Sequence, residues 1–104
     1  MKMMVLAAST AALSLGVVAN ASAEDATALA TKSGCLACHQ VETKVVGPAY
    51  KEVAAKYKGQ DVLEELVAKV KNGGSGVWGP VPMPPNVNVS EDDIRTIVTW
   101  VLSL

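Results

Sequence analysis

Two cysteines and a histidine stand at a spacing that could attach a cofactor. Cys35 and Cys38 flank Leu36 and Ala37, and His39 follows directly. Cys-x-x-Cys-His is the pattern of c-type haem attachment, in which the two thiols add across the haem vinyl groups. The adjacent imidazole would then lie under the iron as an axial ligand. The motif therefore predicts one covalently bound haem c, with His39 as the proximal ligand.

Three other uses of a Cys-x-x-Cys pair compete with this interpretation. A thioredoxin-type redox pair usually starts a helix after a strand, in a βαβ pattern that this sequence lacks. A structural zinc ion takes four ligands, and two cysteines with one histidine leave that set one short. A disulfide between Cys35 and Cys38 would close a strained ring. Haem attachment is the best supported of the four readings.

A second iron ligand has few candidates, because His39 is the single histidine of the chain. Three of the four methionines stand within the first four residues, and the fourth is Met83. A methionine paired with a histidine on haem iron raises the reduction potential. Met83 is therefore the leading candidate for the distal ligand, with a lysine as the fallback. The structural alternative is that Met83 merely fills a gap in the core.

Met83 lies in a long segment, 73–89, that is rich in glycine and proline. A loop of this length inside a small domain is usually functional or disordered. The presence of Trp78 and Met83 argues against disorder, and four prolines stiffen the segment. We expect this loop to hold one side chain in place without support from a helix or strand.

The N-terminal residues have the features of an export signal. Lys2 gives a short basic start, residues 3–19 are apolar, and Ala21-Ser22-Ala23 is an A-x-A cleavage site. We expect residues 1–23 to be a cleaved Sec-type signal peptide and 24–104 to form a single periplasmic domain of 81 residues. An uncleaved membrane anchor is the alternative, but the apolar run is shorter than the roughly 20 residues of a spanning helix.

Charge and size limit the remaining function classes. Loss of Lys2 with the signal would change the formal net charge from −1 to −2. Nucleic-acid and anionic-membrane partners require a basic face, so we expect neither nucleic-acid binding nor stable membrane insertion. A domain of this size buries a modest core and usually needs a metal or a disulfide for additional stability. A covalently attached haem would supply that stability.

Apolar periodicity predicts an all-α domain, because no strand-like alternation is present. Helices are expected over 25–33 and 49–58. A third should begin after Asp61 as N-cap, with Glu64 completing a capping box, and end at Asn72. A fourth should begin after Ser90 as N-cap. Its buried stripe is predicted to contain Ile94, Ile97, Val98, Val101 and Leu102, with Trp100 added.

With these elements in this order, the chain resembles a class I cytochrome c. In particular, it is similar to the short bacterial type that carries electrons in the periplasm of denitrifying and respiring bacteria. The likeness covers essentially all of 24–104, and Trp-Gly-Pro-Val-Pro-Met-Pro-Pro (78–85) is its most specific part. The matching segments are 34–39, 46–51, 53–56, 71–73, 76–80, 82–86 and 100–103. The resemblance implies a class I cytochrome c fold of four to five short helices wrapped around one covalently attached haem c.

The resemblance also implies roles for individual residues. Cys35 and Cys38 would hold the haem through thioethers, and His39 and Met83 would be the axial iron ligands. The carbonyl of Pro48 would accept the imidazole N–H, which fixes the ring and tunes its basicity. From the residues alone, Pro48 could instead be a simple turn former.

Three further residues would contact the cofactor if the resemblance holds. Trp78 would donate its indole N–H to a haem propionate, Lys69 would approach a propionate, and Asn86 would hydrogen-bond near the Met83 sulfur. Plain core packing is the alternative for Trp78, and a solvated charge at a helix end is the alternative for Lys69. The chain departs from the family at Ala30, near a position that often carries an aromatic, which predicts a looser contact with the last helix.

We interpret the protein as a one-electron carrier that is not an enzyme, and we expect it to be a monomer. The resemblance implies nitrite reductase, a terminal oxidase and a cytochrome bc complex as redox partners. Carriers need small interfaces and fast release. We therefore expect an apolar docking patch of Val45, Val46, Pro48, Pro80, Val81 and Pro82, ringed by Lys32, Lys44 and Lys51.

Two functions from other classes stay open at this point. A small haem-based peroxidase or gas-binding sensor would need an open sixth site on the iron, which one histidine and a mobile Met83 would permit. The prolines around Met83 argue against that mobility. A copper or haem chaperone could instead use the cysteine pair with Met83.

Overall fold

The computed structural model describes residues 22–104, so most of the predicted signal peptide lies outside the described residues. This part of the chain folds into α1 (Ala23–Lys32), the short 3-10 helix η1 (Cys35–Ala37), α2 (Tyr50–Tyr57), α3 (Leu63–Asn72) and α4 (Glu91–Leu102). Over 22–104 there is no β-strand, and the ladder contacts are two isolated bridges, His39–Lys44 and Gly74–Met83. The predicted all-α class is confirmed.

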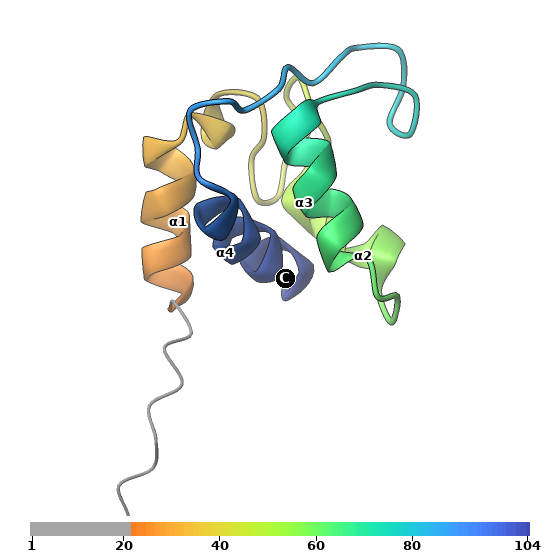
Figure 1. The fold of residues 1–104 in the computed structure, drawn as a ribbon. Helices are drawn as coiled ribbons and strands as arrows, with labels where there is room; N and C mark the ends of the chain where they lie inside the picture. The colour runs from red at the N-terminus through yellow and green to blue at the C-terminus, as the bar shows by residue number, and fades with distance from the viewer. Residues whose placement is uncertain (1–21) are drawn as a thin grey trace, which may run out of the picture.

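Helix α4 is the centre of the fold and packs against α1, α2 and α3 (Figure 1). Two groups of buried side chains meet on it. Ala26, Ala30, Tyr50, Ile97, Trp100 and Val101 form the first group, between α1, α2 and α4. Val67, Ile94 and Val98 form the second group, between α3 and α4. The predicted stripe of α4 therefore faces the core, with Leu102 half-buried at its end.

Cap residues explain where two of the helices, α1 and α4, begin. Ser90 caps α4 as predicted, because the Asp93 N–H donates to its hydroxyl at 3.2 Å. Helix α1 begins two residues earlier than predicted, since the hydroxyl of Ser22 accepts the Asp25 N–H at 3.2 Å. Helix α2 is shorter than predicted by one residue at each end. Differences of this size are usual at helix ends.

The predicted cap of α3 is wrong. Helix α3 begins at Leu63 with Val62 as its N-cap residue, and no side chain caps it. Glu64, the expected partner of Asp61 in a capping box, is instead held by Arg95 of α4. The guanidinium donates to both carboxylate oxygens of Glu64 at 2.9 Å. A contact between two helices has therefore replaced the local motif.

The contact between α1 and α4 depends on small side chains. Ala26 and Ala30 are buried to 1% and 0% exposure and lie in one cluster with Trp100 and Val101. Since alanine occupies little volume, α1 lies close to α4 and the large Trp100 fills the space beside it. The looser contact predicted from Ala30 is not what the structure shows.

The 73–89 segment runs from the end of α3 across to the start of α4 and contains no helix (Figure 1). It faces the 38–48 segment, so that two irregular stretches of chain oppose each other next to α2 and α3. In the described part of the chain, no helix has the length and apolar character needed to span a membrane.

Candidate haem-binding site

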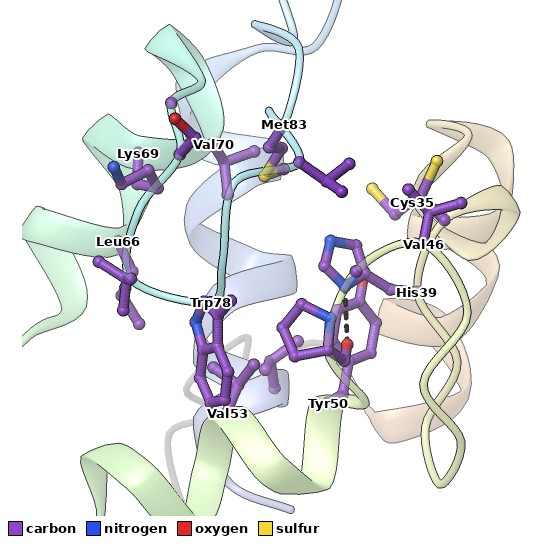
Figure 2. Close-up of a pocket in the computed structure, with 18 of the residues that line it drawn as sticks. Cys35, His39, Val46, Tyr50, Val53, Leu66, Lys69, Val70, Trp78 and Met83 are labelled. Atoms are coloured by element: carbon purple, nitrogen blue, oxygen red, sulfur yellow. Dashed lines mark hydrogen bonds between the residues drawn. The ribbon is translucent and has the colours of Figure 1, made fainter.

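A cavity of about 490 Å³ lies between these two irregular segments, and α2, α3 and α4 form its walls. Its size falls within the range of about 300–1,000 Å³ that is typical of cofactor and ligand sites. Figure 2 shows His39 and Cys35 on one side of it and Met83, Leu66 and Val70 on the other. The lining also includes Val53, Trp78, Ile94, Ile97, Val98 and Val101. Most of these side chains are apolar, so the cavity suits a large apolar group.

The imidazole of His39 is held by a backbone carbonyl. Its Nδ1 lies 2.8 Å from the carbonyl oxygen of Pro48, shown dashed in Figure 2. Because a carbonyl can only accept, Nδ1 must carry the proton, and the lone pair of the neutral ring is then on Nε2. That is the tautomer a metal-ligating histidine needs. The predicted partner of Pro48 is thus found at hydrogen-bond distance.

Gly47 is a residue of this site that the sequence motifs did not single out. An added Cβ would collide with the His39 ring, lying 2.7 Å from Nδ1 and 2.9 Å from Nε2. The Gly47 N–H also donates to the carbonyl of Cys38 at 2.8 Å, which brings this turn against the motif. A side chain is therefore excluded at this position by the imidazole itself.

Cys35 is the first residue of the short helix η1, and Cys38 directly follows its last residue. Gly34 precedes them with a φ of +80°, a conformation that glycine adopts without strain. Both thiols are free and half-buried beside the cavity. Burial raises the pKa of the Cys35 thiol above its usual range. A thioredoxin-type pair needs the opposite, a thiol with a lowered pKa at the start of a helix that follows a strand.

The other two uses of the pair gain no support either. Across the described residues, no three His, Cys, Asp or Glu side chains come together as a possible metal site. The zinc interpretation would need such a cluster. The structure contains no Cys35–Cys38 disulfide, since both thiols are free.

Met83 is positioned by its backbone. Its N–H donates to the Gly74 carbonyl at 2.8 Å, and its carbonyl accepts the Gly74 N–H at 3.0 Å. A side chain at Gly73 would collide with the Met83 carbonyl and would lie 2.8 Å from the nitrogen of Pro85. The Met83 segment is therefore fastened to the C-terminal end of α3, and the side chain lines the cavity.

Asn86 adds a second link between this loop and α3. Its side-chain amide donates to the carbonyls of Val70 at 3.1 Å and Pro84 at 3.4 Å. Its backbone N–H also donates to the Val70 carbonyl, at 3.2 Å. The predicted contact near the Met83 sulfur stays a prediction. The observed bonds tie the residues after Met83 to the last turn of α3.

Trp78 and Lys69 both line the cavity, as expected for residues that would approach the cofactor. Trp78 is 41% exposed, and the ammonium of Lys56 lies 5.5 Å from its ring centroid, within cation–π range. Lys69 is half-buried and folds toward the backbone of Gly74. Their bonds to propionates stay predictions, and the Lys56 contact is one that the sequence pattern did not indicate.

The donor set fits a covalently bound haem. Two thiols, an imidazole with Nε2 free and a thioether all line one apolar cavity. This combination is the one that c-type cytochromes use. The fold and the site together are those of a class I cytochrome c.

Comparison with known proteins agrees with this assignment. The cytochrome c family model matches residues 23–104. Over 77 residues the chain is 58% identical to cytochrome c-552 of Nitrosomonas europaea, which covers 73% of this chain and 75% of that protein. Over 82 residues it is 57% identical to cytochrome c-551 of Pseudomonas aeruginosa, covering 78% of each. The crystal structure of wild-type Nitrosomonas europaea cytochrome c552 matches with a TM-score of 0.73 at 57% identity, over 75% of this chain and 98% of that chain.

The chain belongs to the cytochrome c family. Its cofactor is one covalently attached haem c, and its general role is electron transport. The predicted family, fold class and cofactor are confirmed.

Proposed function

We propose that this protein is a periplasmic one-electron carrier, with Cys35 and Cys38 as thioether residues and His39 and Met83 as axial ligands. Haem c bound in this way would supply a one-electron ferric–ferrous couple. The observation that carries the proposal is the restraint on both ligand residues. Pro48 holds the imidazole of His39, and the Gly74 bridge holds the backbone of Met83.

These restraints favour a carrier over an enzyme or a gas sensor. An enzyme or sensor would need Met83 to leave, so that a substrate or gas could reach the iron. Two backbone hydrogen bonds on Met83, together with the three donated by Asn86, oppose that movement. Each such bond contributes about 0.5–1.5 kcal/mol. The apolar walls around the ligands exclude water and thereby favour the less charged ferrous form.

An absorption experiment on the purified holoprotein tests the ligand assignment. We expect a weak far-red band in the ferric form, sharp bands after reduction, and no response of the reduced form to carbon monoxide. The Met83→Ala variant should lose the far-red band and bind carbon monoxide. The matched control Val87→Ala changes an exposed residue of the same loop (79% exposed) and should behave like the wild type. A wild-type response to carbon monoxide would favour the peroxidase or sensor function instead.

The residues of the proposed docking patch line the cavity, and three of them are at least half exposed. Val45, Val46 and Val81 are 50%, 52% and 61% exposed and line the cavity. Pro48, Pro80 and Pro82 line it too. Of the three lysines, Lys51 donates to Glu42 at 2.7 Å, so its charge is largely compensated. Lys44 and Lys32 are therefore the better candidates for steering an acidic partner.

Transfer rates to purified redox proteins test this surface and the proposed partners, nitrite reductase, a terminal oxidase and a cytochrome bc complex. Val46→Ser should slow transfer by weakening the apolar contact, and Lys44→Glu should change its dependence on ionic strength. Val87→Ser is the matched control, because Val87 is exposed but does not line the cavity. Unchanged rates in the Val46 and Lys44 variants would place the docking surface elsewhere.

Export is tested by the N-terminus of the protein from a periplasmic fraction. A mature chain that begins at Glu24 would support cleavage after Ala23. That cleavage would remove Ser22, so α1 would rely on Glu24 and Asp25 in its first turn for favourable interaction with the helix dipole. A chain that retains its first residues in the membrane fraction would support the anchor instead.

A further inference from the structure

A buried tyrosine lies directly against the imidazole of the site. Tyr50 is the first residue of α2 and is 6% exposed. Its ring stacks on that of His39, with centroids 5.1 Å apart and planes inclined by 18° (Figure 2). This spacing lies within the 4.5–7 Å range of favourable aromatic pairs. Tyr50 therefore contacts the face of the ring whose edge binds Pro48.

The position of Tyr50 is itself fixed from two directions. Its backbone N–H donates to the carbonyl of Gln40 at 2.9 Å, so the start of α2 is bound to the residue that follows His39. Its ring meets the edge of Trp100 of α4, with centroids 5.6 Å apart and planes at 82°. Trp100 is 8% exposed and belongs to the main core cluster. The core thus supports Tyr50, and Tyr50 supports the imidazole.

The hydrogen bond to Pro48 cannot orient the imidazole completely. The ring plane rocks about the Cβ–Cγ bond, and one hydrogen bond at Nδ1 tolerates a range of these angles. A stacked neighbour restrains that remaining freedom, because rocking would separate the two faces or drive them into overlap. Gly47 provides a second contact with the ring, since no side chain fits there. Hydrogen bond, glycine and tyrosine therefore restrain different motions.

We propose that Tyr50 is a positioning residue that sets the orientation of the His39 imidazole plane. This inference rests on the proposed function, in which His39 is an axial ligand of the haem. Tyr50 acts on the imidazole through its ring face, which is the part that contacts His39. The orientation of the imidazole plane affects how the ligand orbitals overlap with those of the iron, so the effect is visible in the electronic structure of the ferric state.

Proton NMR of the ferric holoprotein tests the proposal, because the shifts of the haem methyl groups depend on the orientation of the axial imidazole. Tyr50→Phe keeps the ring and should keep the wild-type order and spread of these resonances. Tyr50→Leu removes the ring and should change both. Tyr50→Met is a second ring-free variant, since methionine fills irregular core gaps and tolerates substitution. At least one of the two should fold and attach haem.

The matched control is Val67→Ala, which truncates a fully buried side chain of α3 that does not line the cavity. It should lower stability and leave the methyl pattern unchanged. If Tyr50→Leu and Tyr50→Met lose stability but keep the wild-type pattern, Tyr50 is only a packing residue and the proposal is overturned. A change of the methyl pattern in Val67→Ala as large as that in Tyr50→Leu would also overturn it. A wild-type spectrum without histidine–methionine features would instead refute the ligand assignment, and the two failures are therefore distinguishable.

Discussion

Replacing Gly47 with alanine should perturb the proximal side of the site more than any change of one methyl group elsewhere in the loop. Gly47 is not among the glycines with a positive φ, so its backbone suits alanine and the collision with His39 is the whole effect. The new Cβ would lie 2.7 Å from Nδ1 of the ring. Non-bonded carbon contacts settle near about 3.5 Å, so the ring must retreat by about 0.8 Å.

We expect the retreat to carry Nδ1 away from the Pro48 carbonyl, and a movement of that size in this direction would break their bond. The present N···O distance is 2.8 Å, and a separation of about 3.6 Å is no longer a hydrogen bond. Overpacking costs about 1–3 kcal/mol and the lost bond about 0.5–1.5 kcal/mol. Together these give a loss of about 1.5–4.5 kcal/mol, and a loss of about 2 kcal/mol would lower Tm by about 8–16 °C in a domain of this size.

The measurements are the free energy of unfolding in guanidinium chloride and the reduction potential of the holoprotein. The bond to Pro48 makes the imidazole a stronger donor and so favours the ferric form. Its loss should therefore raise the potential. Gly59→Ala is the control, because Gly59 has a φ of +76° and nothing within 4 Å. It should cost roughly 1–2 kcal/mol through backbone strain and leave the potential unchanged. Wild-type stability and potential in Gly47→Ala would refute the reasoning.

Three further predictions concern the elements around the site. Asn86→Ala removes the amide hydrogen bond that ties the loop to Val70. It should lower the free energy of unfolding in guanidinium chloride by about 0.5–1.5 kcal/mol and let the reduced protein bind carbon monoxide slowly. If no carbon monoxide binds, the Gly74 bridge alone is enough to hold Met83 in place. The hydrogen bond from Arg95 holds the pKa of Glu64 below its ordinary value of 4.5. This stabilisation is present above pH 4.5 and is lost as the pH falls through the lowered pKa of the folded state. Glu64→Gln should therefore be less stable than the wild type at neutral pH, and its free energy of unfolding should fall less on acidification. Urea unfolding at a series of pH values measures both. Ser90→Ala should cost about 1 kcal/mol in thermal unfolding through loss of the α4 cap; an unchanged Tm would mean that the cap is dispensable.

Much of the site could be predicted because its chemistry is encoded in a few adjacent residues. The Cys35–His39 motif requires no knowledge of the fold, and a single histidine with one methionine outside the first four residues leaves few ligand choices. The helices were predicted for the same reason, since apolar periodicity and a cap such as Ser90 act over one or two turns. The Asp61 cap failed because Arg95, 31 residues away from Glu64, binds that carboxylate in the folded chain.

The sequence by itself therefore determined the class of fold, the covalent attachment motif and the candidate ligands, because these depend on residue type and short spacing. The resemblance already implied the contact of Pro48 with His39, but only the tertiary structure decided which other groups restrain the candidate ligands. It places the Pro48 carbonyl and Tyr50 ring on His39, and the Gly74 backbone on Met83. These contacts join residues 9 to 11 positions apart through irregular segments, beyond the reach of helix periodicity. Which of them form depends on how the two irregular segments pack with α2 and α3. No local pattern records that packing, and the packing sets the orientation of the candidate ligands.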